Sequence, residues 1–183
     1  MEIIMYFVIC YFIGNFMTGW IVGKWYGVSL QNENSGNVGA RNAGRTLGKL
    51  AFCFVFFGDA LKGVVAFLYG KYLGLDEMII SFGVLFCILG HLFPIFLRLK
   101  GGKGVATMIG GLISLNPILF LTLAIGTIVA LPFTKSLTKS MVFGFIVYSA
   151  SIFLLHKQMY FPIIFALVMI TWKHRESLMI RWR

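Results

Sequence analysis

Long apolar runs separated by short polar segments are the main pattern of this 183-residue chain. Three of these runs, 3–23, 50–70 and 78–97, are each about 20 residues long, the length that an α-helix needs to cross a bilayer. The first run has no basic start and no small-residue cleavage site, so we expect a retained helix and not a signal peptide. The pattern predicts an all-α, polytopic membrane bundle that forms one domain over residues 1–183.

The apolar runs after residue 104 are shorter. Prolines and polar pairs interrupt them and leave four segments, 105–115, 118–131, 141–155 and 159–172. Helices of these lengths reach only about 16 to 23 Å, less than the hydrocarbon thickness of roughly 30 Å, so they must be short, tilted or packed against longer neighbours. We favour seven crossings, because five would place Lys135 and Lys139 on the external side; five nevertheless satisfies the same parity.

Composition excludes a soluble domain, since 59% of the residues are hydrophobic, 12% are charged and the mean hydropathy is +0.89. The net charge of +10 is distributed by side of the membrane, so nucleic acid is not an expected partner. Basic residues follow the first, third and last runs, whereas the loop 71–77 carries Asp76 and Glu77. The positive-inside rule therefore predicts an external amino terminus, a cytoplasmic carboxyl terminus and an odd number of crossings.

The cysteines and histidines give no sign of a metal centre. Cys10, Cys53 and Cys87 stand alone in apolar runs, without the C-x-x-C or Cys/His spacing of a metal site. We expect packing roles for them, and we expect neither a metal nor a cofactor.

The first polar loop, 34–45, combines glycines, neutral donors and a cation. Glycine permits turns that bring main-chain N–H groups close to an anion, and arginine can hold phosphate oxygens with two hydrogen bonds. Its candidate binding residues are Ser35, Gly36, Asn37, Gly39, Arg41, Asn42 and Arg45. A solvated loop is also commonly polar and rich in glycine, so this loop alone leaves both interpretations open.

A second polar segment reads Gly101-Gly102-Lys103-Gly104 immediately before an apolar run. Free N–H groups and a positive helix end beside a lysine suit a phosphate group. The segment is not a Walker A loop, because Leu97 stands where that pattern needs glycine and Gly104 where it needs Ser or Thr. His91, just upstream, is expected to be structural.

Charged residues also occur inside or beside the apolar runs. Asp59 and Lys62 are three residues apart, so an ion pair is the expected arrangement, and Lys62 is also a candidate to face the site through a wet crevice. The terminal segment 173–177 adds His174 and further cations, which are either membrane anchors or part of the same site.

Taken together, these motifs resemble the PlsY-type acyl-phosphate:glycerol-3-phosphate acyltransferases, which are bacterial integral membrane enzymes. The resemblance is carried in order by Ser35 to Arg45, Gly58-Asp59-Ala60-Leu61-Lys62-Gly63, Gly90 to Thr107 and His174-Arg175-Glu176. It implies transfer of a fatty acyl group from acyl phosphate to the 1-hydroxyl of glycerol 3-phosphate, giving lysophosphatidic acid and phosphate. It also implies seven helices and a site on the cytoplasmic face of the bacterial plasma membrane.

The resemblance also assigns roles to residues. It implies Ser35, Gly36, Asn37, Gly102 and Lys103 for acyl phosphate, and Arg45 with the carboxyl-terminal segment for glycerol 3-phosphate. The candidate catalytic residues are Lys103, Arg45, Ser35 and His174, and the remaining binding candidates are Gly39, Arg41, Asn42, Lys62, Gly101, Gly104 and Ser177. An acyl phosphate is already activated and no G-x-S-x-G motif is present, so we expect direct attack by the substrate hydroxyl. The proton goes either to the donor phosphate or to His174.

The chain departs from the family pattern at four positions. Arg41 stands where Thr is typical, Ser177 where Asn is typical, Leu178 where Ile is typical and Ile180 where Arg is typical. One alternative is therefore a divergent paralogue that binds the ligands with little turnover. Another is an organic-phosphate transporter, although the inverted repeats typical of transporters are not evident. Expected partners are the two substrates and membrane lipids, and a monomer is one alternative for the oligomeric state.

Overall fold

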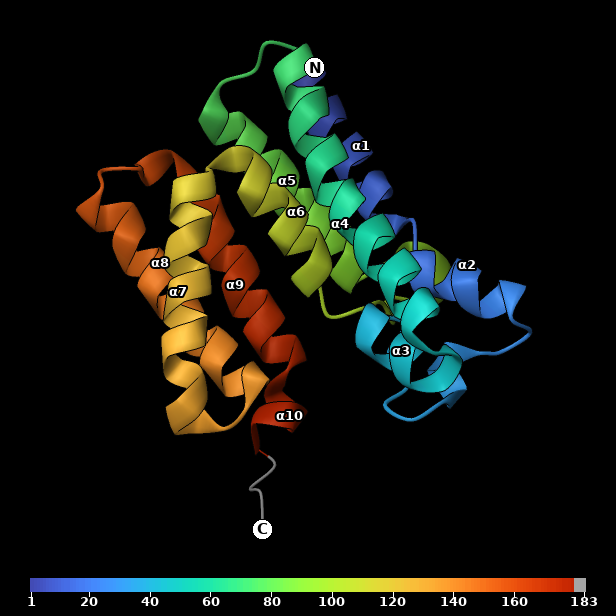
Figure 1. The fold of residues 1–183 in the computed structure, drawn as a ribbon. Helices are drawn as coiled ribbons and strands as arrows, with labels where there is room; N and C mark the ends of the chain where they lie inside the picture. Colours follow the sequence, from blue (N-terminus) through green and yellow to red (C-terminus); the bar gives the residue numbers. More distant parts are fainter. Residues whose placement is uncertain (180–183) are drawn as a thin grey trace.

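The structure, a computed structural model, describes residues 1–179, and every regular element in that range is a helix (Figure 1). Ile180, Arg181, Trp182 and Arg183 lie outside the described residues. The α-helices are α1 Glu2–Asn15, α2 Thr18–Trp25, α3 Ala40–Leu47, α4 Lys49–Tyr72, α5 Glu77–Leu92, α6 Val105–Leu115, α7 Pro117–Thr134, α8 Leu137–Leu154, α9 Phe161–Lys173 and α10 Arg175–Met179. Short 3-10 turns lie at Leu30–Asn32, Ile95–Leu97 and Gln158–Tyr160. The all-α prediction is confirmed.

Successive long helices run in alternate directions, so the amino terminus and α10 lie at opposite ends of the molecule (Figure 1). Helices α1, α4, α5 and α6 form one group, and α7, α8 and α9 form a second group beside it. The packing of α5 against α9 joins the two groups. Helix α5 is central, since 61% of its apolar stretch is buried, against 22% for α7.

Five helical stretches in the described part of the chain are long and apolar enough to cross a membrane. They are Glu2–Trp25, Lys49–Tyr72, Glu77–Leu97, Pro117–Thr134 and Leu137–Leu154, and the shorter apolar stretches are Val105–Leu115 and Gln158–Lys173. Pro132 lies inside α7, so that helix continues beyond the expected segment 118–131. The seven-crossing arrangement stays a prediction.

The first expected segment, 3–23, is divided in the structure. Phe16 and Met17 have extended backbone between α1 and α2, and α2 turns away from the bundle (Figure 1). Hydropathy does not reveal this break, because the residues on both sides of it are apolar. Two backbone carbonyls at this break accept hydrogen bonds from another element of the protein.

Close backbone contact fixes how α6 packs against α4. A Cβ atom on Gly63 of α4 would lie 2.2 Å from the carbonyl oxygen of Thr107, and one on Gly110 of α6 would lie 2.0 Å from that of Ala60. No side chain fits at such distances, so both positions require glycine for the two backbones to meet. The loop before α6 is thereby held against the bundle.

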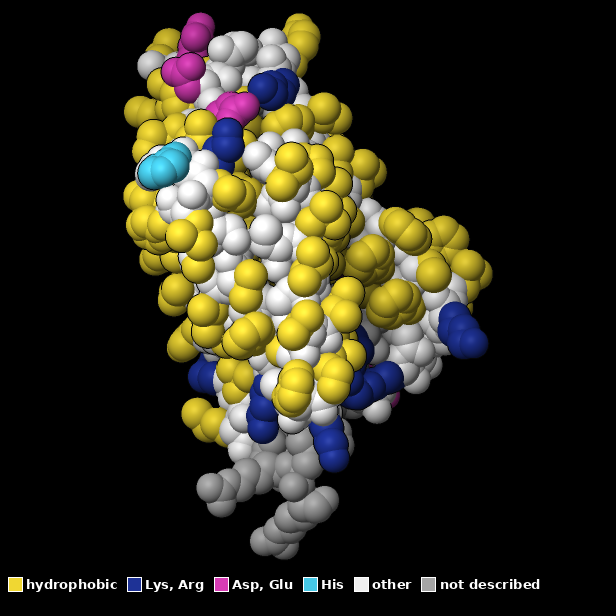
Figure 2. Space-filling view, turned by 60° about the vertical axis from the view of Figure 1, so that its left-hand side comes forward, with side chains coloured by type: hydrophobic (Ala, Val, Ile, Leu, Met, Phe, Trp, Pro, Cys, Tyr) yellow, Lys and Arg dark blue, Asp and Glu magenta, His cyan; other side chains and the backbone are white. Residues whose placement is uncertain are grey.

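Charge separates along the long axis of the molecule. Figure 2 shows acidic side chains gathered at one end with some Lys or Arg beside them, more Lys and Arg toward the other end, and a broad hydrophobic band between the two ends. The loop 71–77, with Asp76 and Glu77, lies at the end of the amino terminus, and α3, α10 and the loop before α6 lie at the opposite end (Figure 1). We call that opposite end the basic end.

Candidate active site

Three polar segments that are distant in the sequence meet at the basic end (Figure 1). They are the loop 26–39 with α3, the loop 93–104 between α5 and α6, and the junction of α9 with α10. Of the predicted site residues, all except Lys62 lie in these segments: Ser35, Gly36, Asn37, Gly39, Arg41, Asn42, Arg45, Gly101, Gly102, Lys103, Gly104, His174 and Ser177.

Asn42 organises the first segment. Its side chain is buried, and Nδ2 donates to the carbonyl oxygens of Leu30 at 3.0 Å and Glu33 at 3.1 Å. Its Oδ1 accepts from the backbone N–H of Ser35 at 3.3 Å and from Ser35 Oγ at 3.2 Å. These bonds occupy both ends of the amide, so Asn42 holds the loop on α3 while Ser35 itself stays exposed.

Helix α3 presents two exposed guanidinium groups. Arg41 and Arg45 are four residues apart, so they project from the same side of the helix. Arg41 is close enough to the other two segments to lower the pKa of both Lys103 and His174. Arg41 therefore lies near Lys103 and His174, and we call Arg41, Arg45, Lys103 and His174 the basic cluster.

Lys103 joins the second segment to the third. Its half-buried ammonium donates to Ser177 Oγ on α10 at 3.2 Å. Burial lowers the pKa of Lys103, Glu176 opposes that effect, and Arg41 adds to it. The lysine precedes the amino-terminal end of α6, where Gly104 has a φ of 81° and where the first N–H groups of a helix lack intrahelical acceptors.

The turn that carries Lys103 rests on His91. The N–H of Gly102 donates to the carbonyl oxygen of His91 at 3.1 Å. A Cβ on Gly102 would lie 2.1 Å from His91 Nε2, and one on Gly101 would lie 2.1 Å from the His91 carbonyl oxygen. Both glycines are thus required because a side chain would collide with His91. The sequence had indicated a different role for them, the approach of backbone N–H groups to an anion.

His174 is buried and holds one defined tautomer. Its Nδ1 lies 2.9 Å from the carbonyl oxygen of Ile170, which can only accept, so Nδ1 carries the proton. Burial lowers the pKa of His174; its bond to Ile170 opposes the shift, while Lys103 and Arg41 add to it. The ring is therefore neutral at pH 7 and leaves Nε2 as a proton acceptor.

Lys62 lies apart from these loops, inside the bundle. Its Nζ is 2.9 Å from Asp59 Oδ1 and 2.8 Å from Nδ1 of His91. The expected Asp59–Lys62 ion pair is confirmed, and His91 has the structural partner that was expected of it. Lys62 is buried and its polar contacts are made to other groups of the protein, whereas the other candidates lie in the segments at the basic end.

Two residues that act on the basic cluster were not among the predicted site residues. Glu176 influences the pKa of Lys103, and His91 supports the Gly101-Gly102 turn. Both residues belong to motifs that carry the family resemblance: His91 shares one with Lys103, and Glu176 shares one with His174. Membership in these motifs was the sequence signal that could have identified them.

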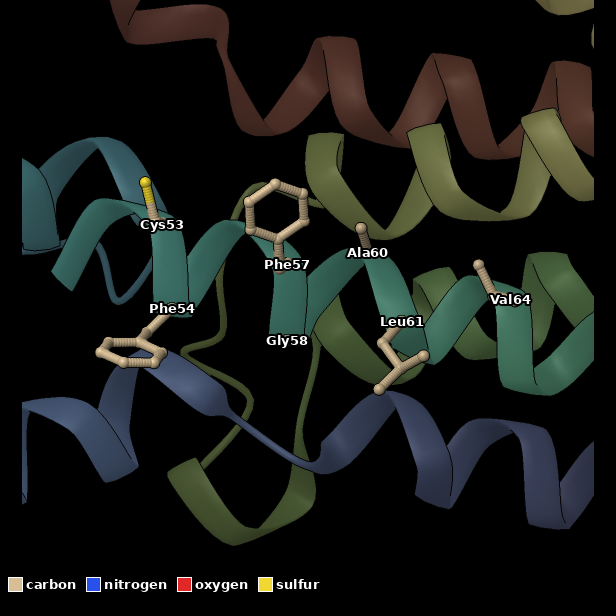
Figure 3. A pocket seen from close by; sticks show the side chains of 7 residues that line it. All are labelled: Cys53, Phe54, Phe57, Gly58, Ala60, Leu61 and Val64. Atoms are coloured by element: carbon tan, nitrogen blue, oxygen red, sulfur yellow. The ribbon is translucent and has the colours of Figure 1, made fainter. Parts of the chain in front are cut away.

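Two hollows on the surface of the described residues lie away from the basic cluster. Figure 3 shows one on the outer face of α4, where Cys53, Phe57, Ala60 and Val64 point to one side of the helix and Phe54 and Leu61 to the other. No residue lining it is charged, so it offers nothing to a phosphate. A second hollow, between α1 and α4, is apolar except for Thr18 and Lys62.

Comparisons with known proteins agree with the fold and with the order of the motifs. The family model described as Glycerol-3-phosphate acyltransferase matches residues 4–181. A protein named Glycerol-3-phosphate acyltransferase 1 from Bacillus cereus is 43% identical over 136 residues, covering 74% of this chain and 75% of its own length. Glycerol-3-phosphate acyltransferase from Clostridioides difficile is 37% identical over 153 residues, which cover 79% of this chain and 75% of that protein.

Solved structures give the same result. A crystal structure of PlsY, described as an integral membrane glycerol 3-phosphate acyltransferase in its glycerol 3-phosphate form, superposes with a TM-score of 0.83 at 30% identity. The lysophosphatidic acid form of PlsY gives a TM-score of 0.85 at the same identity. Each comparison covers 97% of this chain and 90% of the other.

Proposed function

This chain belongs to the glycerol-3-phosphate acyltransferase family, and from that premise we propose that it transfers a fatty acyl group from acyl phosphate to glycerol 3-phosphate. The products are lysophosphatidic acid and inorganic phosphate, and the reaction belongs to phospholipid biosynthesis. The observation that carries the proposal is that Lys103, Ser177, His174 and Arg41, from three distant segments, share one end of a membrane protein.

Both substrates carry phosphate, so the site must neutralise two anions that repel each other. A cation about 4 Å from one phosphate charge contributes roughly 4 kcal/mol at an effective dielectric constant of 20, before desolvation is subtracted. We assign Lys103 and the turn Gly101–Gly104, with Ser35, Gly36 and Asn37, to acyl phosphate. Arg45 and the α10 segment are assigned to glycerol 3-phosphate.

The reaction needs no covalent enzyme intermediate. The 1-hydroxyl oxygen of glycerol 3-phosphate forms a bond to the acyl carbonyl carbon, and the bond from that carbon to the phosphate oxygen breaks. Lys103 and main-chain N–H groups stabilise the charge that develops on the oxygens. The hydroxyl proton goes to Nε2 of His174, whose Nδ1 is already protonated, or to the departing phosphate.

We also propose a cytoplasmic location for the site. The protein is a multi-pass membrane protein, and its basic end fits the cytoplasmic side of a bacterial plasma membrane by the positive-inside rule. Both water-soluble phosphate groups then approach from the cytoplasm, while the acyl chain stays in contact with the apolar helices.

The alternatives make different predictions. A transporter has no support from the family match, and the polar candidates gather at one end of the protein instead of midway along it. A paralogue that binds without turnover would differ from an enzyme only in product formation. Arg41, which occupies the place of a typical Thr, lies near both Lys103 and His174, so it is the departure that bears most directly on this choice.

An assay of the purified protein decides among the three. Acyl phosphate and glycerol 3-phosphate are supplied in detergent, lysophosphatidic acid is measured, and glycerol 3-phosphate binding is measured by calorimetry on the same sample. We expect product. Binding without product would favour the impaired paralogue, and uptake of glycerol 3-phosphate into vesicles without product would favour the transporter.

A further inference from the structure

Three buried polar side chains lie together where α4, α5 and the α1–α2 break meet. Asp59, Lys62 and His91 are 1%, 4% and 2% exposed. Lys62 Nζ lies 2.9 Å from Asp59 Oδ1 and 2.8 Å from His91 Nδ1, and His91 Nδ1 lies 3.7 Å from the same Asp59 oxygen. Charges buried inside a membrane protein are costly and are commonly associated with function. We refer to these three residues as the buried triad.

Lys62 also binds the broken end of α1. Its Nζ donates to the carbonyl oxygen of Phe16 at 2.9 Å and to that of Gly14 at 3.4 Å. The last carbonyls of a helix have no intrahelical donor, and inside a bilayer there is little water to serve instead. The ammonium group of Lys62 therefore satisfies two of the carbonyls at the break.

The same break is tied to the loop that leads to Lys103. Asn15 Oδ1 accepts from the N–H of Ile95 at 2.7 Å, and Tyr11 donates its hydroxyl to the carbonyl oxygen of Phe93 at 2.7 Å. Both contacts join α1 to the segment that follows α5. A shift of the break would consequently be transmitted to the loop 93–104.

The triad also determines which way the His91 ring is protonated. A lysine ammonium can only donate, so Nδ1 of His91 accepts from Lys62 and the proton of the neutral ring is on Nε2. That Nε2 edge lies directly against Gly102, at the place where a side chain would be. The backbone of His91 holds the same turn through its carbonyl oxygen.

We propose that Asp59, Lys62 and His91 are positioning residues, which set the Gly101–Lys103 turn relative to the α1–α2 break and so place Lys103 for the two phosphates. Lys62 then acts through His91 and not as a ligand of the substrate. The inference rests on the proposed function, because the position of Lys103 matters only if the protein binds the two phosphate-bearing substrates.

The first test uses His91→Asn, because the Asn side-chain oxygen replaces Nδ1 as acceptor for Lys62 while the ring beneath Gly102 is removed. We expect the melting temperature to stay near that of the wild type and the KM for acyl phosphate, the substrate assigned to the turn, to rise about tenfold. A wild-type KM and kcat in a folded His91→Asn protein would overturn the inference.

The second test combines this change with Gly102→Ala. In the wild-type background the new methyl group meets the His91 ring, so we expect a loss in kcat/KM of about a hundredfold or more. In the His91→Asn background space is available, and the same change should cost at least about tenfold less. Losses that simply multiply would show that the ring does not position the turn.

The third test removes both charges with Asp59→Asn and Lys62→Met together, which avoids leaving one buried charge unpaired. We expect weaker acyl-phosphate binding by calorimetry and a lower kcat. The matched control is Tyr160→Phe at the opposite end, which removes a buried hydroxyl bonded to Glu77 and to the Leu115 carbonyl oxygen. That control should lower the melting temperature and leave kcat and binding unchanged.

The outcomes separate the two proposals. An inactive wild type would contradict the proposed function, and the binding measurements would still decide the inference. An active wild type with unaltered kinetics and binding in the double charge variant would overturn the inference and leave the proposed function standing.

Discussion

Arg41 is the residue whose charge links the three segments of the candidate site, since it lowers the pKa of Lys103 and of His174. For a base, a lowered pKa means that the unprotonated form persists to lower pH. Burial is the main reason that His174 stays neutral, and Lys103 and Arg41 add to it, so Nε2 is free to accept a proton over a wider pH range than in an ordinary histidine.

The first prediction concerns Arg41→Thr. Removal of this cation should raise the pKa of His174, so the acid limb of the kcat/KM profile should move to higher pH. The measurement is the pH profile of the variant beside Lys139→Thr, which loses one cation at the same end but does not act on His174. An acid limb that stays in place in Arg41→Thr would show that Arg41 does not act on the group that accepts the proton.

The second prediction concerns Ser177, the acceptor for Lys103. Hydrogen bonds to charged groups contribute about 1.5 to 3 kcal/mol, so Ser177→Ala should lower kcat/KM by roughly tenfold or more. Ser177→Asn restores an acceptor and should retain most of the activity. Equal losses in the two variants would mean that the contact with Lys103 is not the reason for the effect.

At the scale of elements, two of the three polar segments are each held by one buried side chain. Asn42 holds the loop before α3, and His91 holds the turn before α6. The exposed groups Ser35 and Arg45 and the half-buried Lys103 are in this way presented on a backbone that the protein itself supports. The candidates therefore divide into residues that face the ligands and residues that hold the loops.

The third prediction follows from that division. Asn42→Ala leaves the carbonyls of Leu30 and Glu33 without their donor, so the loop 30–39 should become more sensitive to proteolysis and the KM for both substrates should rise about tenfold. Asn32→Ala, at an exposed position of the same loop, is the matched control. Unchanged cleavage and kinetics in Asn42→Ala would contradict the role given to its amide.

Much at this scale could be predicted from sequence. Apolar run length indicated the long helices, and the order of the glycine and cation motifs indicated the family. The α1–α2 break could not be predicted, because it is stabilised by hydrogen bonds of Lys62 and Asn15. A hydropathy profile shows that these two residues are polar but not which groups they bond. The support of Gly102 by His91 depends on a tertiary contact, and spacing along the chain cannot reveal it.

At the scale of the whole molecule, the helix directions and the separation of charge fit seven crossings with the basic end in the cytoplasm. The short helices α6 and α9 contribute to the central core instead of spanning alone in lipid. Packing against α5 and α4 explains how such short elements are accommodated.

The fourth prediction tests this arrangement by single-cysteine labelling in a variant without Cys10, Cys53 and Cys87. A cysteine at His156 should react with an impermeant reagent in intact cells, and one at Lys135 should react only after the cells are opened. Labelling of Lys135→Cys from outside would contradict seven crossings and favour five.

The central claim is that the polar loops form one site around Lys103. The most direct measurement is lysophosphatidic acid formation by purified Lys103→Ala beside Lys100→Ala, an exposed neighbour in the same loop. We predict a loss of about a thousandfold or more in Lys103→Ala, with normal folding in detergent and near-normal turnover in the control. Wild-type turnover in a folded Lys103→Ala protein would contradict the account.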